Sequence, residues 1–275
     1  MSYSKSLDKT RRIYWDFFGG KPEKIASVPG RLDFLNTHQD YKGLPVVSIS
    51  VNLRCYTAVS SSSDERGVAV SFNYMEEGLS YYDEFSLKEL EPVGRESFSG
   101  YLRAAVKVLL EKGCRVGGFR AGIYSEVPIA SGMGSSAALT ASFIAALNAL
   151  FELGLSESEI AEYAYIAEHD VLGIPCGRLD QYSCVYGGVA LIRTRPPYSV
   201  ELLPRLSGVF TVVDSGVRHR TADVHPRRQS EIEEGLKLLM GMDLPRALKA
   251  KLGYRYWEPE WEFIELEEIE HFLRS

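Results

Sequence analysis

Helical spacing of apolar positions marks four parts of the chain. Residues 7–18 mix charged and aromatic side chains and stop at two glycines, which predicts an opening helix. Residues 98–110 place their aliphatic side chains on one face and precede Lys112-Gly113, which predicts a helix with a C-terminal stop. Residues 156–169 begin with Ser156, and Glu159 follows at capping-box spacing, which predicts another helix. The charged, leucine-rich tail from Arg227 is also predicted to be helical.

Strands are predicted where β-branched residues alternate with polar ones or form short apolar runs. These runs lie at 25–28, 45–52, 56–60, 68–72, 118–125, 188–193 and 209–214. The first third of the chain is therefore rich in strands. The character of the sequence changes near Arg195-Pro196-Pro197, so we expect two domains, residues 1–195 and 196–275.

Composition and charge exclude several classes of protein. A chain of 275 residues with 45% hydrophobic and 25% charged residues is typical of folded globular proteins. The formal net charge of -6 and the lack of a basic stripe argue against a nucleic-acid partner. The polar N-terminus and the lack of long apolar runs argue against a membrane partner and predict a cytoplasmic location. The cysteines and histidines form no zinc motif.

A glycine-rich segment at 128–138 leads into a long apolar stretch that is predicted to be a buried helix starting at about Ser135. Gly132 and Gly134 allow a tight turn, and an anion there would meet free N–H groups and the positive end of the helix dipole. The segment lacks the lysine of a Walker A loop and does not match G-x-G-x-x-G. Spacing alone equally allows a plain loop that Ser135 caps before a core helix.

The same segment, PIASGMGSSAA, resembles the second signature of the GHMP kinase superfamily, P-x-x-x-G-L/M-G-S-S-A-A. This resemblance implies a loop that wraps the phosphates of ATP. The ATP-binding residues it implies are Gly132, Met133, Gly134, Ser135, Ser136 and Ala137. It also implies that the serine pair, through Ser136, helps to hold Mg²⁺, a task for which hard hydroxyl oxygens are suited.

Residues 29–41, PGRLDFLNTHQDY, are predicted to lie between strands, where a surface turn would carry polar residues freely. The string resembles the galactokinase signature P-G-R-V-N-L-I-G-E-H-T-D-Y. The resemblance implies that Arg31 stabilises charge on the transferred phosphate. It implies a sugar-binding role for Thr37, His38 and Asp40.

A third string, AEH at 167–169 followed by PCGRLDQ at 175–181, is similar to A-E-H and P-C-G-I-M-D-Q of galactokinases, with the same spacing between the Glu and the Asp. Taken alone, Glu168 could be a solvated helix residue and Asp180 a helix-entry acid. The resemblance implies that Glu168 contacts Mg²⁺, that Gly177 lies at the sugar, and that Asp180 deprotonates or orients the attacking hydroxyl. A weaker match follows at 214–219, with Arg227 and Arg228 resembling a basic helix start.

Together these matches cover residues from about 24 to 232 and imply an α+β fold of the GHMP type. The expected arrangement is a ribosomal protein S5 domain 2-like N-terminal domain and a partial ferredoxin-like C-terminal domain. The implied activity is transfer of phosphate from ATP, with Mg²⁺, to the anomeric hydroxyl of a monosaccharide. Alternatives are a non-catalytic sugar- and ATP-binding protein, an inactive truncated kinase, and a GHMP kinase for mevalonate or homoserine. The kinase hypothesis requires the 128–138 loop, Asp180 and Arg31 to meet across a single cleft.

The chain departs from galactokinases in two places. Asn36-Thr37 replaces Gly-Glu, so a carboxylate expected near the sugar C6 hydroxyl is missing, and we predict that a C6-altered or amino sugar is tolerated. Galactokinases also continue into a third, glycine-rich signature that this sequence lacks. We therefore expect a separate C-terminal chain, a homo-oligomer that completes the site, or an inactive remnant.

Overall fold

The computed structural model describes residues 3–90, 94, 97–213, 216 and 221–273, and within them a seven-stranded sheet forms the centre of the fold. The strand order is β4-β3-β5-β2-β6-β7, and β1 pairs with β2. All pairs are antiparallel except β3 with β5. The strands are β1 (Lys24–Leu35), β2 (Val46–Ser61), β3 (Arg66–Ser71), β4 (Tyr82–Ser86), β5 (Phe119–Ser125), β6 (Val189–Arg193) and β7 (Ser199–Leu203).

Strand β2 organises the sheet because it is long enough to pair with two strands on one side. Its first residues, from Val46 to Ile49, pair with β6, and its last residues, from Cys55 to Ser61, pair with β5. The two strands predicted at 45–52 and 56–60 are therefore one strand. The polar interruption at Asn52 does not end it, since that side chain is exposed.

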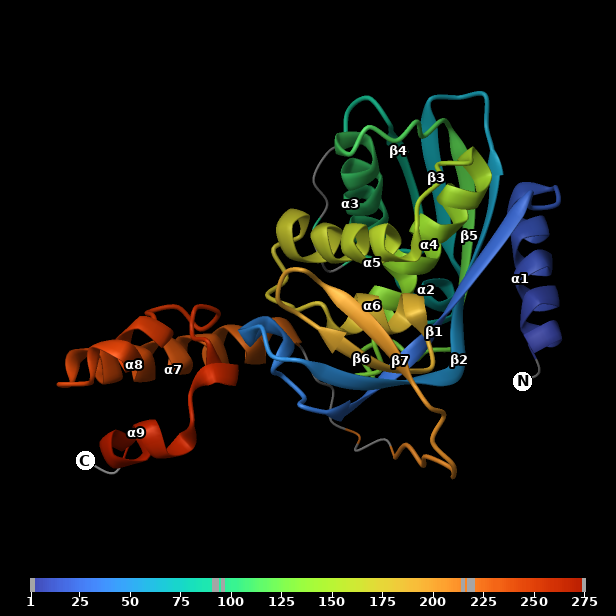
Figure 1. Cartoon of the computed structure of the whole chain (residues 1–275). Helices are drawn as coiled ribbons and strands as arrows, with labels where there is room; N and C mark the ends of the chain where they lie inside the picture. The colour runs from blue at the N-terminus through green and yellow to red at the C-terminus, as the bar shows by residue number, and fades with distance from the viewer. Residues whose placement is uncertain (1–2, 91–93, 95–96, 214–215, 217–220, 274–275) are drawn as a thin grey trace.

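Helices cover both faces of the sheet (Figure 1). On one face α3, α4 and α5 enclose the main core around Phe119, Phe143 and Leu147. On the other face α1 packs Ile13 against Tyr56 and Tyr124. The helices of this part are α1 (Tyr3–Phe18), α2 (Phe72–Glu76), α3 (Phe98–Glu111), α4 (Ser135–Phe151), α5 (Glu157–Ile166) and α6 (Leu179–Tyr186). The predicted opening helix and the predicted helices at 98–110 and 135 onward are confirmed.

The predicted helix at 156–169 is only partly regular. Its capping box is confirmed, with the Ser156 hydroxyl accepting from the Glu159 N–H and the Glu159 carboxylate accepting from the Ser156 N–H. After Ile166, however, the chain widens into a π-helical turn, Ala167–Val171. Such turns are rare and often occur at functional sites. This one contains Glu168.

The part that follows β7 is helical, with α7 (Thr221–Gly241), α8 (Arg246–Lys251), α9 (Leu266–Leu273) and a 3₁₀ turn, Trp261–Phe263. Leu236, Leu244, Leu248 and Leu252 form a small core of their own. None of the described residues after Leu203 is in a strand, so this part shows no ferredoxin-like sheet. None of the helices that the structure describes is long and apolar enough to span a bilayer.

The strand predicted at 209–214 is wrong over its described residues, 209–213, which are irregular and exposed, while Asp214 lies outside the described residues. A strand needs a neighbour to pair with, and no described strand pairs with this segment. The weak match at 214–219 lies, apart from Gly216, outside the described residues. The domain boundary at 195/196 stays a prediction, although β7 continues the sheet to Leu203.

Candidate active site

Strand β1 presents Arg31 at a point where its pairing with β2 is irregular. The register shifts between Pro29 and Arg31, so the ladder skips Gly30. Three residues of β2, 51–53, stand opposite this one residue of β1, so the extra residues of the bulge lie on β2. The string at 29–41 was predicted to lie between strands, and the structure instead places residues 29–35 inside β1.

Gly30 and Arg31 also hold the glycine-rich loop. The Arg31 N–H donates to the Met133 carbonyl at 3.0 Å. A side chain at Gly30 would come within 2.9 Å of the same carbonyl oxygen, so the close approach of strand and loop requires glycine here. The backbone of β1 thus fixes the loop next to the Arg31 side chain.

The Arg31 guanidinium joins the loop to Asp180. Its Nε and Nη2 donate to Asp180 Oδ1 at 2.8 and 2.6 Å, and its Nη1 donates to the Gly132 carbonyl. Asp33 Oδ1 lies 3.3 Å from Nε. The predicted meeting of loop, arginine and aspartate is therefore present in the structure.

Arg31 stays charged although it is almost fully buried, with 7% of its surface exposed. Burial alone would lower the pKa of Arg31, but the negative charges of Asp180 and Asp33 outweigh burial and raise it. The site therefore keeps a fixed positive charge beside the loop.

The N-terminus of α4 has no side-chain cap. The capping position is Gly134, which adopts a left-handed backbone (φ 70°) and has no side chain with which to cap the helix N–H groups. Ser135 is the first helical residue, so the alternative in which it caps the helix is wrong. The first helical N–H with a backbone partner is that of Ala138, which donates to Gly134 at 2.9 Å. The preceding N–H groups, from Ser135 to Ala137, are the donors that an anion would meet.

Glu168 lies in the interior close to this helix start. It is 2% exposed, and its Oε1 has no hydrogen-bond partner within the part of the chain that the structure describes. Burial raises the pKa of Glu168 to about 7, neighbouring Gln181 and Ser136 act in the opposite sense, and the charge of Asp180 adds to the rise. A buried carboxylate oxygen without a partner beside a serine hydroxyl fits a hard divalent cation.

Helix α6 carries Asp180 in its first turn, and two groups hold that helix start. Asp40 Oδ2 accepts from the Leu179 N–H at 3.1 Å. A side chain at Gly177 would come within 2.0 Å of the same oxygen, so glycine is required for the contact. The predicted sugar-binding residue Asp40 and the predicted catalytic residue Asp180 are thereby connected through one helix end.

Arg178, immediately before α6, forms the second anchor and was not predicted. Its guanidinium lies between the rings of Tyr165 and Tyr198, at 3.9 and 3.8 Å from their centroids. It also makes a two-pronged ion pair with Glu162, at 2.9 and 2.8 Å. Tyr182 donates to the same carboxylate at 2.8 Å. Arg178 occupies a position that is apolar in the galactokinase string, so the resemblance did not predict a role for it.

Two predicted sugar-binding residues, Thr37 and His38, are exposed on the loop after β1. His38 has a positive φ of 62°, which is uncommon outside glycine and holds the loop in a tight turn. The loop continues into the 3₁₀ turn Asp40–Lys42. Thr37 and His38 thus lie on the same short segment as Asp40.

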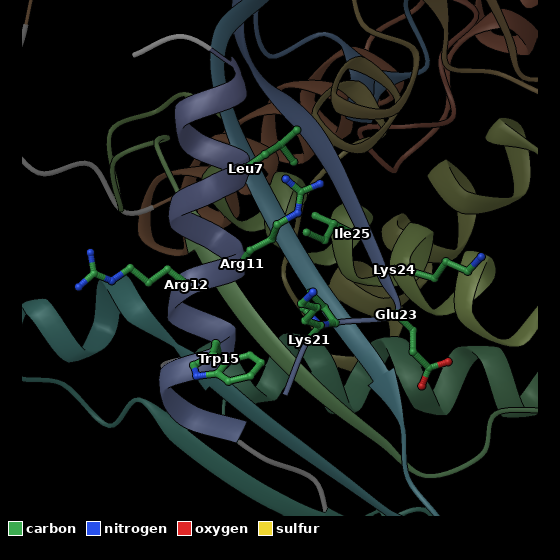
Figure 2. Close-up of a pocket in the computed structure, with 9 residues that line it drawn as sticks. Leu7, Arg11, Arg12, Trp15, Lys21, Glu23, Lys24 and Ile25 are labelled. Atoms are coloured by element: carbon green, nitrogen blue, oxygen red, sulfur yellow. The ribbon is translucent and has the colours of Figure 1, made fainter. Parts of the chain in front are cut away.

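A cavity of about 540 Å³ lies elsewhere, between α1 and the start of β1 (Figure 2). Arg11, Arg12, Trp15, Lys21 and Lys24 are among the residues around it, and none of the predicted site residues lines it. We assign the site to the residues around Arg31, because opposed charges and an uncapped helix start meet there.

Comparison with known proteins gives a consistent result. Residues 100–188 match the GHMP kinases N-terminal domain, and residues 14–61 match the galactokinase galactose-binding signature. The galactokinase of Chloroflexus aurantiacus is 32% identical over 227 residues, which are 81% of this chain and 57% of that protein. The galactokinase of Thermococcus kodakarensis is 29% identical over 215 residues, 77% of this chain and 59% of that protein. The chain thus spans less than two thirds of the length of these relatives.

Among solved structures, Lactococcus lactis galactokinase complexed with galactose superimposes with a TM-score of 0.71 at 23% identity, covering 88% of this chain and 64% of that one. Methanococcus jannaschii mevalonate kinase gives a TM-score of 0.56 at 21% identity, covering 67% of this chain and 56% of that one. These likenesses show the fold. The family models, the relatives and the fold together place this chain in the GHMP kinase family, as a galactokinase-like member.

Proposed function

We propose that this chain transfers the γ-phosphate of ATP to the anomeric hydroxyl of a monosaccharide. The observation that carries the proposal is the position of Arg31, which hydrogen-bonds both Asp180 and the Gly132 carbonyl. One buried positive charge thus connects the phosphate-binding loop to the carboxylate at the acceptor. Phosphoryl transfer needs mainly alignment and stabilisation of negative charge, and this arrangement supplies both.

The ATP phosphates would bind at the uncapped start of α4, where the N–H groups of Ser135, Ser136 and Ala137 face outward from the helix end. Gly132, Met133 and Gly134 shape the loop around them. Ser136 and Glu168 would hold Mg²⁺, which supplies positive charge to the phosphate oxygens when bound.

Asp180 would act on the sugar hydroxyl. Both hydrogen bonds from Arg31 reach Oδ1, which leaves Oδ2 to accept from the hydroxyl. Asp180 orients this hydroxyl or takes its proton while the hydroxyl oxygen bonds to the γ-phosphorus. The bond from phosphorus to the bridging oxygen breaks, and ADP leaves. Arg31 stabilises the negative charge that spreads over the transferred group.

The sugar would be held by Asp40, His38, Thr37 and the backbone at Gly177. Because Thr37 stands where galactokinases carry a glutamate, the C6 side of the acceptor meets a small neutral group. We expect turnover of a C6-altered or amino sugar at least as fast as that of galactose. The location in the cytoplasm and the assembly with further chains stay predictions.

The experiment is a coupled assay of ADP release over a panel of monosaccharides, with mevalonate and homoserine as non-sugar acceptors. Sugar-dependent ADP release supports the proposal, and the Thr37→Glu variant should shift the preference towards galactose. If galactose is clearly the best substrate of the unaltered protein, our expectation for Thr37 is wrong. Binding of ATP and sugar without ADP release would favour the non-catalytic alternative instead.

A further inference from the structure

Aromatic side chains from two distant parts of the chain meet beside the predicted sugar-binding loop. Tyr41 lies 6.4 Å from the His38 ring and 5.8 Å from the Tyr256 ring, measured between centroids. Tyr256 in turn contacts Trp257 edge to face at 4.7 Å. Tyr256 and Trp257 belong to the C-terminal tail, outside the stretch that resembles galactokinases. None of the roles discussed above uses them.

This aromatic group borders the acceptor side of the site. Tyr41 follows Asp40, whose carboxylate binds the backbone at the start of α6, one residue before Asp180. Tyr256 is half-buried, and its ring contacts the ring of Tyr41 edge to face. The tail therefore reaches the surroundings of the acceptor carboxylate.

The tail is held in this place by specific contacts. Glu258 Oε2 accepts from the N–H groups of Tyr254 and Arg255, at 2.7 and 3.0 Å, which closes a tight turn around the two aromatic residues. Arg195 donates to the Pro259 carbonyl. Figure 1 shows the loop between β1 and β2 reaching towards the C-terminal helices.

The Arg195 side chain also packs against the sugar-binding loop, since a side chain at Gly43 would come within 2.6 Å of its Nε. The same arginine therefore ties tail and loop together. This fixed geometry lowers the entropic cost of using the aromatic rings for binding.

Exposed aromatic rings beside polar groups are typical of sites for amphipathic small molecules. A pyranose ring has hydroxyls at its edge and C–H bonds on its faces, so it needs both hydrogen-bonding groups and an apolar surface. Asp40 and His38 supply the polar groups. Trp257 is 50% exposed, and so it has surface left to bury against a ligand.

We propose that Tyr256 and Trp257 form an aromatic wall of the acceptor site and bury one face of a pyranose that Asp40 and His38 hold by its hydroxyls. The wall selects a cyclic sugar over a linear or strongly charged alcohol. This inference rests on the proposed function, because it names how the same site recognises its substrate.

The test compares Tyr256→Ala and Trp257→Ala with a matched control, Trp15→Ala. Trp15 is equally exposed, at 51%, but lies on α1 beside the distant cavity. Each tail variant should raise the KM for the sugar roughly tenfold, as expected for the loss of one aromatic contact, and leave the KM for ATP unchanged. Tyr256→Phe should keep the wild-type KM because it retains the ring. The control should not change either KM.

A direct binding measurement separates this inference from the proposed function. In protein carrying Trp15→Phe and Trp261→Phe, Trp257 is the sole tryptophan, and titration with each sugar of the panel should change its fluorescence for at least one of them. If the unaltered protein releases ADP but both tail variants keep its sugar KM, the inference is wrong and the function stands. If no ADP is released, the fluorescence titration decides: a saturable change supports the wall, and no change overturns it. An equal loss of affinity for ATP and sugar would also overturn it, since the tail would then only support the fold.

Discussion

Glu168 is a residue whose protonation the fold shifts into the physiological pH range. Its pKa rises from 4.5 to about 7 in the folded chain. Between these values the folded state binds the proton more tightly than the unfolded state does. Stability is therefore highest below pH 4.5 with respect to this group and falls as the pH rises towards 7.

We predict that, in the presence of a chelator, Glu168→Gln is more stable than the unaltered protein at pH 8 and equal to it at pH 4.5. The gain at pH 8 should be on the order of 3 kcal/mol, from the size of the pKa shift. Urea unfolding at several pH values measures it. Added Mg²⁺ should reduce the pH dependence of the unaltered protein only. If the difference in free energy of unfolding between the two proteins stays constant from pH 4.5 to 8, Glu168 does not titrate as described.

At this scale the sequence predicted the residues that the structure brings together. Arg31, Asp180 and the loop residues were found because the strings that contain them resemble the signatures of a known family, whereas spacing alone left other interpretations open. Arg178 was missed, because an arginine before a helix is common on surfaces and only tertiary structure shows it between two tyrosines. The exposed position of Thr37 and His38 also depends on a loop conformation that no pattern specifies.

Helix α6 is the element on which the proposed chemistry depends, because its first turn carries Asp180. Its start is held by Asp40 on one side and by Arg178 on the other. An ion pair between two planar groups fixes orientation as well as distance. Loss of this anchor should therefore misplace Asp180 more than it weakens substrate binding.

We predict that Arg178→Met lowers kcat about tenfold with little change in either KM, since small misplacements of a catalytic group slow chemistry. Arg178→Lys keeps the charge but not the two-pronged geometry, so its kcat should lie between that of the unaltered protein and that of Arg178→Met. Arg193→Met is the control, because Arg193 pairs with Glu201 in an exposed position, 3.6 Å apart. Steady-state kinetics with both substrates measures kcat and the two KM values. An unchanged kcat in Arg178→Met would contradict the proposed role of Arg178 in positioning Asp180.

Among the elements, long periodic segments were predicted well, whereas short segments and segments that depend on a partner strand were not. The helices α3 and α4 were found because their apolar pattern is continuous. Two strands were predicted where β2 runs unbroken, since an exposed polar residue inside a strand looks like a turn in sequence. The apolar segment at 209–213 has strand composition but no described partner strand, and composition cannot supply one.

At the scale of the whole molecule, the candidate site is assembled from segments far apart in sequence. Arg31 and Asp180 come from the sheet and a covering helix, while Tyr256 comes from a tail whose helices form a separate small core. The contact between this tail and the loop proposed to bind sugar could not be predicted, because it depends on tertiary packing between residues that share no motif. The fold itself followed from the family resemblance.

The central claim is that one site moves phosphate from ATP to a sugar and that Asp180 acts on the acceptor. The most direct test is the rate of sugar-dependent ADP release at saturating ATP for the unaltered protein, Asp180→Ala and the control Asp170→Ala. Asp170 is an exposed acid on the π-helical turn, with 59% of its side chain accessible. We predict loss of at least about a hundredfold in rate for Asp180→Ala, as for other groups that align and stabilise phosphoryl transfer, and a normal rate for the control. A normal rate in Asp180→Ala would contradict the account.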